Sequence, residues 1–212
     1  MSPHQPGDFS SLHLGWVIDD VDPEQRGRVQ VSLAAIGTSL WASVVVPAAG
    51  HGYGVSMIPR IGDMVVLGFV DPEHPLVLGS VWSGNASNPL SGAQQARRYL
   101  IRSPAGVQIE IDDDGPSIEL STPGGARVRI DDAAGGSITA ELGGQTVTAG
   151  PSGITVRSSG TVEVEASMIK LSAGMVQVEA GISRFSGVVQ ADTVITNAVV
   201  SSSYTPGAGN IW

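Results

Sequence analysis

Cysteine is absent from this sequence of 212 residues, and so are the long apolar runs that mark membrane proteins. Without thiols, the chain can form neither a disulfide framework nor a thiolate metal site. No apolar stretch approaches the roughly 18 residues of a membrane-spanning helix, and the polar N-terminal residues do not resemble a signal peptide. We therefore expect the protein to be synthesised and assembled in the cytoplasm.

Positive charge is also scarce. Eleven Lys and Arg stand against 20 Asp and Glu, which gives a formal net charge of −9, and Lys170 is the only lysine. Binding to a nucleic-acid backbone needs clustered Lys and Arg. The acidic balance therefore argues against nucleic acid as a partner, and solubility of an extended surface is its simpler explanation.

Aromatic residues make up only 5% of the chain and are concentrated in its first part. Between Tyr99 and Tyr204, the only ring is that of Phe185. A core built almost wholly from Val, Ile, Leu and Ala has to be narrow, which favours a thin, repetitive shaft over a wide sandwich in that region. The rings of the first part are expected to fill a compact core: Trp16, Trp41, Tyr53, Phe69 and Trp82.

Short apolar stretches with period-two alternation follow one another from residue 99 to residue 200, and most are separated by Gly. This alternation predicts strands with one apolar and one polar face, and Gly permits tight turns between them. A spacing of about ten residues is typical of a sandwich, a barrel or a β-solenoid. The expected strands are 107–111, 118–120, 128–130, 138–142, 154–156, 162–166, 169–171 and 176–178.

Residues 14–85 have the pattern of a small closed barrel, in which all strand edges can be paired. Its strands are expected at 14–18, 27–33, 41–47, 64–70 and 76–82. In residues 1–13, His4 and His13 are expected to face solvent. The predicted organisation is an N-terminal arm (1–13), the barrel (14–85), a Ser-, Asn- and Gly-rich linker (86–98), a shaft (99–200) and a C-terminal tip segment (201–212).

The first part resembles a known family, the OB domain of phage baseplate assembly protein V, which is shared with the VgrG spikes of type VI secretion. The resemblance rests on several pieces in a fixed order, which include Gly15–Val17, Asp22–Pro23, Gly27–Val31, Trp41, Val46–Pro47, Ala49–Gly50, Gly54, Pro59–Val65, Phe69 and Asp71–Trp82. A Pro-x-Ile-Gly-Asp turn and an Asp-Pro-x-x-Pro-x-Val-Leu-Gly turn, each beside apolar strands, make the combination specific. The fold that the resemblance implies is all-β: an N-terminal OB-fold barrel followed by an intertwined homotrimeric β-helix, or needle.

The same resemblance implies a structural protein with no catalytic, cofactor or metal site. A homotrimer would form the central spike of a contractile tail baseplate, cap the tail tube and pierce the envelope of a target cell. A baseplate hub protein would bind at the OB end, and a small PAAR-like tip protein at the C-terminal end. It would be assembled in the bacterial cytoplasm and reside in a virion or a phage-tail-like particle of the contractile injection type.

Features of some family members are missing from this sequence. The stretch between Trp82 and Tyr99 is too short for a lysozyme domain, and no His-x-His motif follows residue 75 to bind iron at a tip. No hub-forming portion precedes the barrel, so the hub is expected to be a separate protein. This favours a phage tail or phage-tail-like particle over a type VI spike.

The resemblance assigns the apolar residues of the shaft to the core of the trimer. The expected core residues are Val107, Ile109, Ile111, Val128, Ile130, Ile154, Val156, Val162, Val164, Ile169, Leu171, Val176 and Val178. Tyr204, Ile211 and Trp212 are expected to form the tip or to dock the tip protein.

Two other functions fit parts of the sequence. An OB-fold nucleic-acid binder is one, although the charge disfavours it. The other is a carbohydrate-active tailspike-like enzyme on surface polysaccharide, which would need two carboxylates about 5–10 Å apart; the shaft lacks the aromatic platforms typical of such sites. The candidate carboxylates alternate with apolar residues and should face solvent: Glu110, Glu119, Glu141, Glu163 and Glu165.

Some polar loop residues could suggest metal binding. Asp112–Gly115 and Asp131–Asp132 could supply oxygen ligands to calcium, but the twelve-residue loop pattern is missing, so we interpret them as turn residues. His51 and His74 lie in separate loops with no paired His, and we interpret both as ordinary loop residues.

Overall fold

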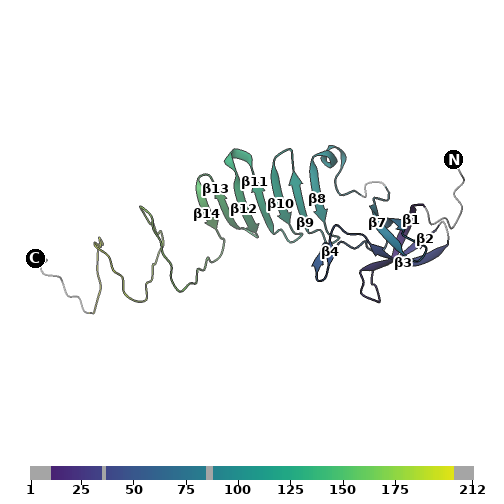
Figure 1. Ribbon diagram of the computed structural model, residues 1–212. Coiled ribbons are helices and arrows are strands. Elements are labelled where there is room, and N and C mark those ends of the chain that lie inside the picture. The colour runs from purple at the N-terminus through teal and green to yellow at the C-terminus, as the bar shows by residue number, and fades with distance from the viewer. Residues whose placement is uncertain (1–10, 35–36, 85–87, 203–212) are drawn as a thin grey trace, which may run out of the picture. The chain divides into compact units, whose positions relative to one another are not determined.

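The computed structural model describes residues 11–34, 37–84 and 88–202, in which strands are joined by turns and two short 3₁₀ segments (Figure 1). The all-β prediction is confirmed for these ranges, and none of their helices is long and apolar enough to cross a membrane. Residues 1–10 and 203–212 lie outside the described ranges, and with them Tyr204, Ile211 and Trp212. The chain divides into two units, Met1–Val162 and Glu163–Trp212.

Five strands close into a barrel, as the sequence pattern predicts, and their order in it is β1-β2-β3-β7-β6. Neighbouring strands are antiparallel except β3 and β7, which run parallel. The strands are β1 (His13–Asp19), β2 (Arg28–Leu33), β3 (Thr38–Val44), β6 (Met64–Phe69) and β7 (Pro75–Val81). A small hairpin of β4 (Ala49–Gly50) and β5 (Tyr53–Gly54) lies in the connection between β3 and β6.

The core of the barrel is aliphatic, so the prediction that aromatic rings fill it is wrong. Trp16, Tyr53 and Trp82 remain 42%, 74% and 64% exposed, and only Phe69 packs against the core from its edge. The physical reason is space, because the interior of a small barrel has room for side chains of about the size of Val and Leu. The buried core consists of Val17, Val29, Val31, Leu33, Ala42, Val65, Leu67 and Val77.

His13 is buried, which contradicts the expectation that it faces solvent. It is the first residue of β1, and the alternation of this strand turns His13, Gly15 and Val17 inward. Its ring contacts the ring of Phe69 edge-on, with 5.7 Å between the centroids. The barrel therefore begins one residue earlier than predicted.

Gly15 lies where β1 and β2 approach each other closely. A Cβ at this position would overlap the side chain of Val31 and lie 2.9 Å from the carbonyl oxygen of Ser32. We expect Gly15→Ala to lower the free energy of unfolding by roughly 1–3 kcal/mol, the usual cost of overpacking a core, as measured by urea unfolding. Gly79→Ala on β7 is the control, because a Cβ there meets no atom within 4 Å. Equal losses in the two variants would contradict this explanation.

Seven further strands form an open antiparallel meander, in which each strand pairs with its neighbour in sequence. They are β8 (Arg98–Arg102), β9 (Gln108–Asp112), β10 (Ser117–Ser121), β11 (Arg127–Asp131), β12 (Ser137–Leu142), β13 (Gln145–Gly150) and β14 (Gly153–Arg157). The five predicted strands up to residue 156 are confirmed. Strands β8 and β13 were not predicted. In β13, Val147 is the only large apolar residue. The 3₁₀ segment η1 (Gly92–Ala96) precedes β8, and η2 (Ala133–Gly135) joins β11 to β12.

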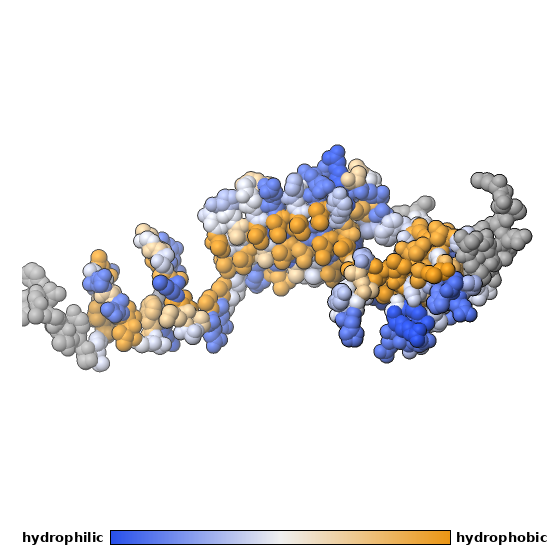
Figure 2. All heavy atoms as spheres, viewed as in Figure 1, coloured by the Kyte–Doolittle hydropathy of each residue, from blue (hydrophilic) through white to orange (hydrophobic). Residues whose placement is uncertain are grey.

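One face of this sheet is apolar along its whole length (Figure 2). The pairing places Ile118 opposite Ile111 and Ile130, and directly opposed residues project from the same side of a sheet. Two rows result, which together form what we call the apolar face. One row contains Tyr99, Ile111, Ile118, Ile130, Ile138, Ala149 and Ile154, and the other contains Ile101, Ile109, Leu120, Val128, Ala140, Val147 and Val156.

No residue between Ser158 and Ser202 lies in a strand. The prediction of strands at 162–166, 169–171 and 176–178 is therefore wrong for the isolated chain. A strand exists only where a second backbone accepts and donates its hydrogen bonds, and a single copy offers no such backbone to this segment. The trimeric β-helix stays a prediction.

Candidate assembly surfaces

The apolar face of the β8–β14 sheet is uncovered. Its large side chains range from 39% exposed at Ile118 to 77% exposed at Ile154, although their alternation is that of residues facing a core. Soluble proteins rarely expose a continuous apolar patch of this kind unless it is an interaction surface. An open sheet with one apolar and one polar face needs a second layer.

The structure brings together six of the residues predicted for the trimer core. Ile109, Ile111, Val128, Ile130, Ile154 and Val156 all lie on the apolar face. Val107 precedes β9 and is 49% exposed, and the six predicted residues from Val162 to Val178 lie beyond the sheet and are exposed. The prediction omitted other members of the same rows, which period-two alternation and the register reveal: Tyr99, Ile101, Ile118, Leu120, Ile138, Ala140, Val147 and Ala149.

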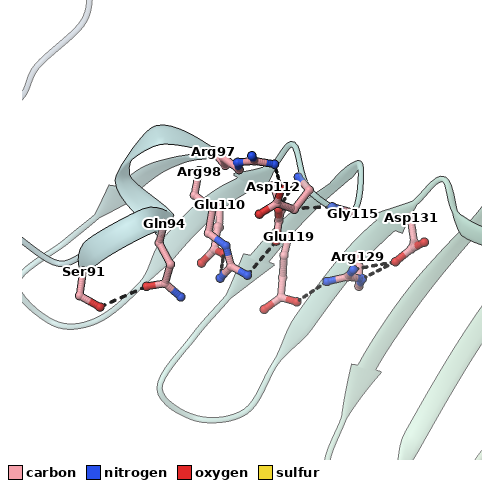
Figure 3. A network of polar contacts seen from close by, with 11 residues as sticks. Ser91, Gln94, Arg97, Arg98, Glu110, Asp112, Gly115, Glu119, Arg129 and Asp131 are labelled. Carbon is pink, nitrogen blue, oxygen red and sulfur yellow. Dashed lines mark hydrogen bonds and ion pairs between the residues drawn. The ribbon is translucent and has the colours of Figure 1, made fainter.

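The opposite face of the sheet carries a network of ion pairs (Figure 3). Glu110 and Glu119 are direct cross-strand partners, an arrangement that is destabilising without compensation. Arg98 offsets the charge of Glu110 and forms 2.9 Å ion pairs with both Glu110 and Asp112. Arg129 offsets the charge of Glu119, at 3.5 Å, and forms a 2.6 Å ion pair with Asp131. Each of the two opposed glutamates therefore has an arginine partner on the polar face.

Two of these carboxylates, Asp112 and Asp131, have a lowered pKa. The hydrogen bond from the Arg129 guanidinium is the main cause that lowers the pKa of Asp131 below its usual value. For Asp112, the main cause of a lowered pKa is the backbone N–H of Asp114, a 2.9 Å bond that confirms the interpretation of Asp112 as a turn residue. Within the described ranges, no group of three His, Asp or Glu residues could hold a metal ion.

The barrel carries a second apolar surface on its outside. The outward-facing residues of β1 are all apolar, with Leu14, Trp16 and Ile18 between 42% and 57% exposed. Trp16 lies opposite Met64, which in turn lies opposite Val81. We define the outer stripe as Leu14, Trp16, Ile18, Met64, Val66 and Val81.

The outer surface of β2 and β3 is different, because polar residues such as Gln30, Ser32 and Ser39 dominate it. Our sequence interpretation missed the outer stripe. The signal was available, since Leu14–Ile18 has no polar residue on either face, and a strand apolar on both faces is typically covered on both.

A buried ion pair braces the turn between β1 and β2. Asp22 accepts hydrogen bonds from the backbone N–H groups of Glu24 at 3.0 Å and Arg26 at 2.8 Å. It also accepts bonds from the Arg28 side chain, from Nε at 3.1 Å and Nη2 at 2.9 Å. The Arg28 guanidinium stacks over the ring of Trp41 at 5.8 Å. The Arg28 contact is the main cause that lowers the pKa of Asp22 far below its usual value.

Residues 13–82 match the model of the type VI secretion system/phage-baseplate injector OB domain family, and these are the residues of the closed barrel. This part of the chain is therefore similar to that family. The recognition of the OB domain from sequence is thereby confirmed.

Relatives that match parts of the chain include spike proteins of Pseudomonas aeruginosa. The chain is 32% identical to the type VI secretion system spike protein VgrG4b over 145 residues, which cover 63% of this chain and 16% of the relative. It is 29% identical to VgrG5 over 110 residues, covering 48% of this chain and 14% of the relative. The chain thus spans about one sixth of the length of these relatives. Their similarity includes residues beyond the injector OB domain.

The Asp22–Arg28 pair should make the injector OB domain sensitive to acid. Because the pKa of Asp22 is lower in the folded than in the unfolded state, its stabilising contribution is complete above about pH 4 and is lost as the pH falls below that value. Thermal unfolding from pH 7 to pH 2 should therefore show a smaller acid-induced drop for Asp22→Asn than for the unchanged chain, from a lower starting point. Glu24→Gln, which removes a 3.1 Å contact to the same guanidinium from an exposed position, should retain most of the drop. Identical pH profiles for Asp22→Asn and the unchanged chain would overturn this assignment.

Proposed function

We propose that the protein is the central spike of a phage-type baseplate or related contractile injection particle and that it works as a homotrimer. The observation that carries the proposal is the uncovered apolar face of the β8–β14 sheet, which follows an injector OB domain in the same chain. The protein acts mechanically: it caps the tail tube and is driven through the envelope of the target cell.

Covering the apolar face is energetically sufficient to hold copies together. Burying the rest of one half-exposed Ile, Leu or Val side chain contributes roughly 1 kcal/mol. The whole face therefore contributes on the order of 10 kcal/mol per chain before the cost of association. Three sheets with their apolar faces turned inward form a closed prism with a narrow core, which agrees with the lack of rings between Tyr99 and Phe185.

The other face of each sheet then forms the outside of the shaft. Its Arg–Glu and Arg–Asp pairs suit a surface in contact with water, and lateral hydrogen bonds between seven strands distribute mechanical load. No catalytic step is needed for this function. A point at the C-terminal end, self-formed or completed by a PAAR-like protein on Tyr204, Ile211 and Trp212, belongs to the same proposal.

The proposal is tested by the mass of the purified full-length chain in light scattering. Three times the chain mass of 21.7 kDa is expected, with resistance to SDS. A monomer would overturn the proposal. A dimer would mean that two sheets pack face to face as a sandwich, which no spike with threefold symmetry can do.

We assign the outer stripe of the barrel to the contact with the baseplate hub. The double variant Leu14→Gln and Trp16→Gln should weaken binding to the purified hub protein of the same particle by at least about tenfold, because both side chains are exposed anchors of the stripe. The mass of the trimer should not change. Ser39→Gln and Ser43→Gln on the outside of β3 form the matched control. Equal binding by both double variants would move the hub contact elsewhere on the barrel.

A further inference from the structure

The segment after the sheet is built from a seven-residue repeat that none of the features described so far explains. Residues 162–189 divide into four consecutive units, VEVEASM, IKLSAGM, VQVEAGI and SRFSGVV. Three positions keep their character in all units. The third is large and apolar (Val164, Leu171, Val178 and Phe185), the fifth is small (Ala166, Ala173, Ala180 and Gly187), and the seventh is apolar (Met168, Met175, Ile182 and Val189).

Nothing in the described part of the chain buries this repeat. All of its residues are exposed, from 56% at Ile169 to 97% at Val188 among the large apolar ones, and none lies in a strand. A repeat with regular apolar and small positions buries its apolar side only by stacking against equivalent units. The same segment of other copies supplies such units.

Self-pairing of a repeat leaves its register undetermined. If one chain is displaced by seven residues, Val164 takes the place of Leu171. The large apolar, small and apolar positions of the repeat then again lie beside equivalent positions of the other chains. Only one unit in four is lost at the end. Register is weakly specified where a shifted pattern fits almost as well as the correct one.

The β8–β14 sheet has no such ambiguity. Its strand connections vary from five residues at 103–107 to two at 143–144, so its strands do not repeat at one period. Its two apolar rows also vary in size, from Tyr99 at one end to Ala140 and Ala149 near the other. A displaced sheet would leave large residues opposite gaps and small ones opposite each other.

We propose that the β8–β14 sheet sets the register of the repeat. Packing of the apolar faces aligns the copies first, and residues 162–189 then pair with the same residues of the other copies. The inference rests on the proposed homotrimer and assigns different roles in its assembly to the sheet and the repeat. The sheet is hydrogen-bonded within each chain and supplies alignment, whereas the repeat depends on other copies for its backbone partners.

The connector between the two parts is short enough to transmit the alignment. Only residues 158–161 separate the end of β14 from Val162. Four residues span at most about 14 Å, whereas a displacement by seven extended residues is about 23 Å along the chain. Once the sheets are aligned, the connector cannot absorb a one-unit shift.

The decisive variant lengthens this connector without touching any packed residue. Seven Gly and Ser residues are inserted after Ser159 in the full-length chain, and the same insert after Ser91 is the control. Met168 and Met175 are natural probes within the repeat, and ¹³C-methyl NMR counts their environments. Threefold symmetry with one register allows a single resonance for each methyl group, whereas a mixture of registers splits each into several.

We expect single resonances for the unchanged chain and the Ser91 insert, and split resonances for the Ser159 insert, with trimer mass in all three. Single resonances in the Ser159 insert would show that the repeat sets its own register and would overturn the inference. Loss of the trimer in that variant would also overturn the inference, because the inference requires the sheets to assemble without the repeat. A monomeric unchanged chain would instead overturn the proposed function, so the two failures are distinguishable.

A second pair of variants tests the sheet itself. Ile118→Ala with Ile130→Ala removes volume from the centre of the apolar face, and Thr139→Ala with Thr148→Ala makes matched changes on the polar face. The first pair should split the Met168 and Met175 resonances of refolded trimers, and the second should not. The same single resonances and the same refolding rate in both pairs would contradict a role for the sheet in setting the register.

Discussion

Ile138→Asp should leave the full-length chain monomeric at micromolar concentrations. Ile138 is 53% exposed in the single chain and lies in the middle of one apolar row, between Ile130 and Ala149. In the proposed trimer, three carboxylates would be buried in a narrow apolar core. Each would either remain charged without a partner or become protonated with its pKa raised by several units, and both outcomes destabilise the trimer. Light scattering measures the result directly.

Thr139→Asp is the matched control, one residue further along the same strand. Thr139 projects from the opposite face and pairs across the strands with Arg129 and Thr148. A carboxylate there gains a cationic neighbour and stays in contact with water, so the trimer should persist. If Thr139→Asp dissociated the trimer and Ile138→Asp did not, the polar face would be the interface and the proposed packing would be inverted.

Val164→Asp should prevent the repeat from assembling and expose it to protease. Val164 is 68% exposed in the single chain and occupies the large apolar position of the first seven-residue unit. Trypsin can cut within the repeat after Lys170 and Arg184. We expect these cuts to be at least about tenfold faster than in the unchanged trimer, because cleavage follows the population of the unassembled segment.

Glu163→Gln provides the comparison for this position. Its side chain alternates with Val162 and Val164 and belongs to the polar side of the segment, so its replacement should leave the cleavage rate unchanged. Rapid cleavage of the unchanged trimer at Lys170 would mean that the repeat does not assemble with other copies. Equal resistance of Val164→Asp would mean that position three of the repeat is not buried.

Much of the sheet was predictable because its information is local. The alternation in Ile109–Glu110–Ile111 and Ile118–Glu119–Leu120 determined which residues share a face before any partner strand was known. The same holds for the barrel strands and for the turn at Asp112. The two turn motifs at Pro59–Asp63 and Asp71–Gly79 were specific enough to identify the injector OB domain, which the family match confirms.

Other features depended on how strands meet in space. The register places Glu110 opposite Glu119, and Arg98 and Arg129 form ion pairs with them. Alternation along one strand does not reveal such contacts, because they join residues on different strands. The dimensions of the closed barrel excluded Trp16 and Trp82 from a core that composition alone would have given them. Trp16 lies instead in the outer stripe.

The all-β class, the OB barrel and the strands that are apolar on one side were predictable from the sequence alone. Whether each strand finds its backbone partner within the same chain depends on the tertiary structure. Up to Arg157, each strand pairs within its own chain, so only side chains remain to be covered. Beyond it, the alternation of Val162, Val164 and Ile169 continues without any strand, because hydrogen bonding between strands is a property of two backbones and one copy supplies only one of them.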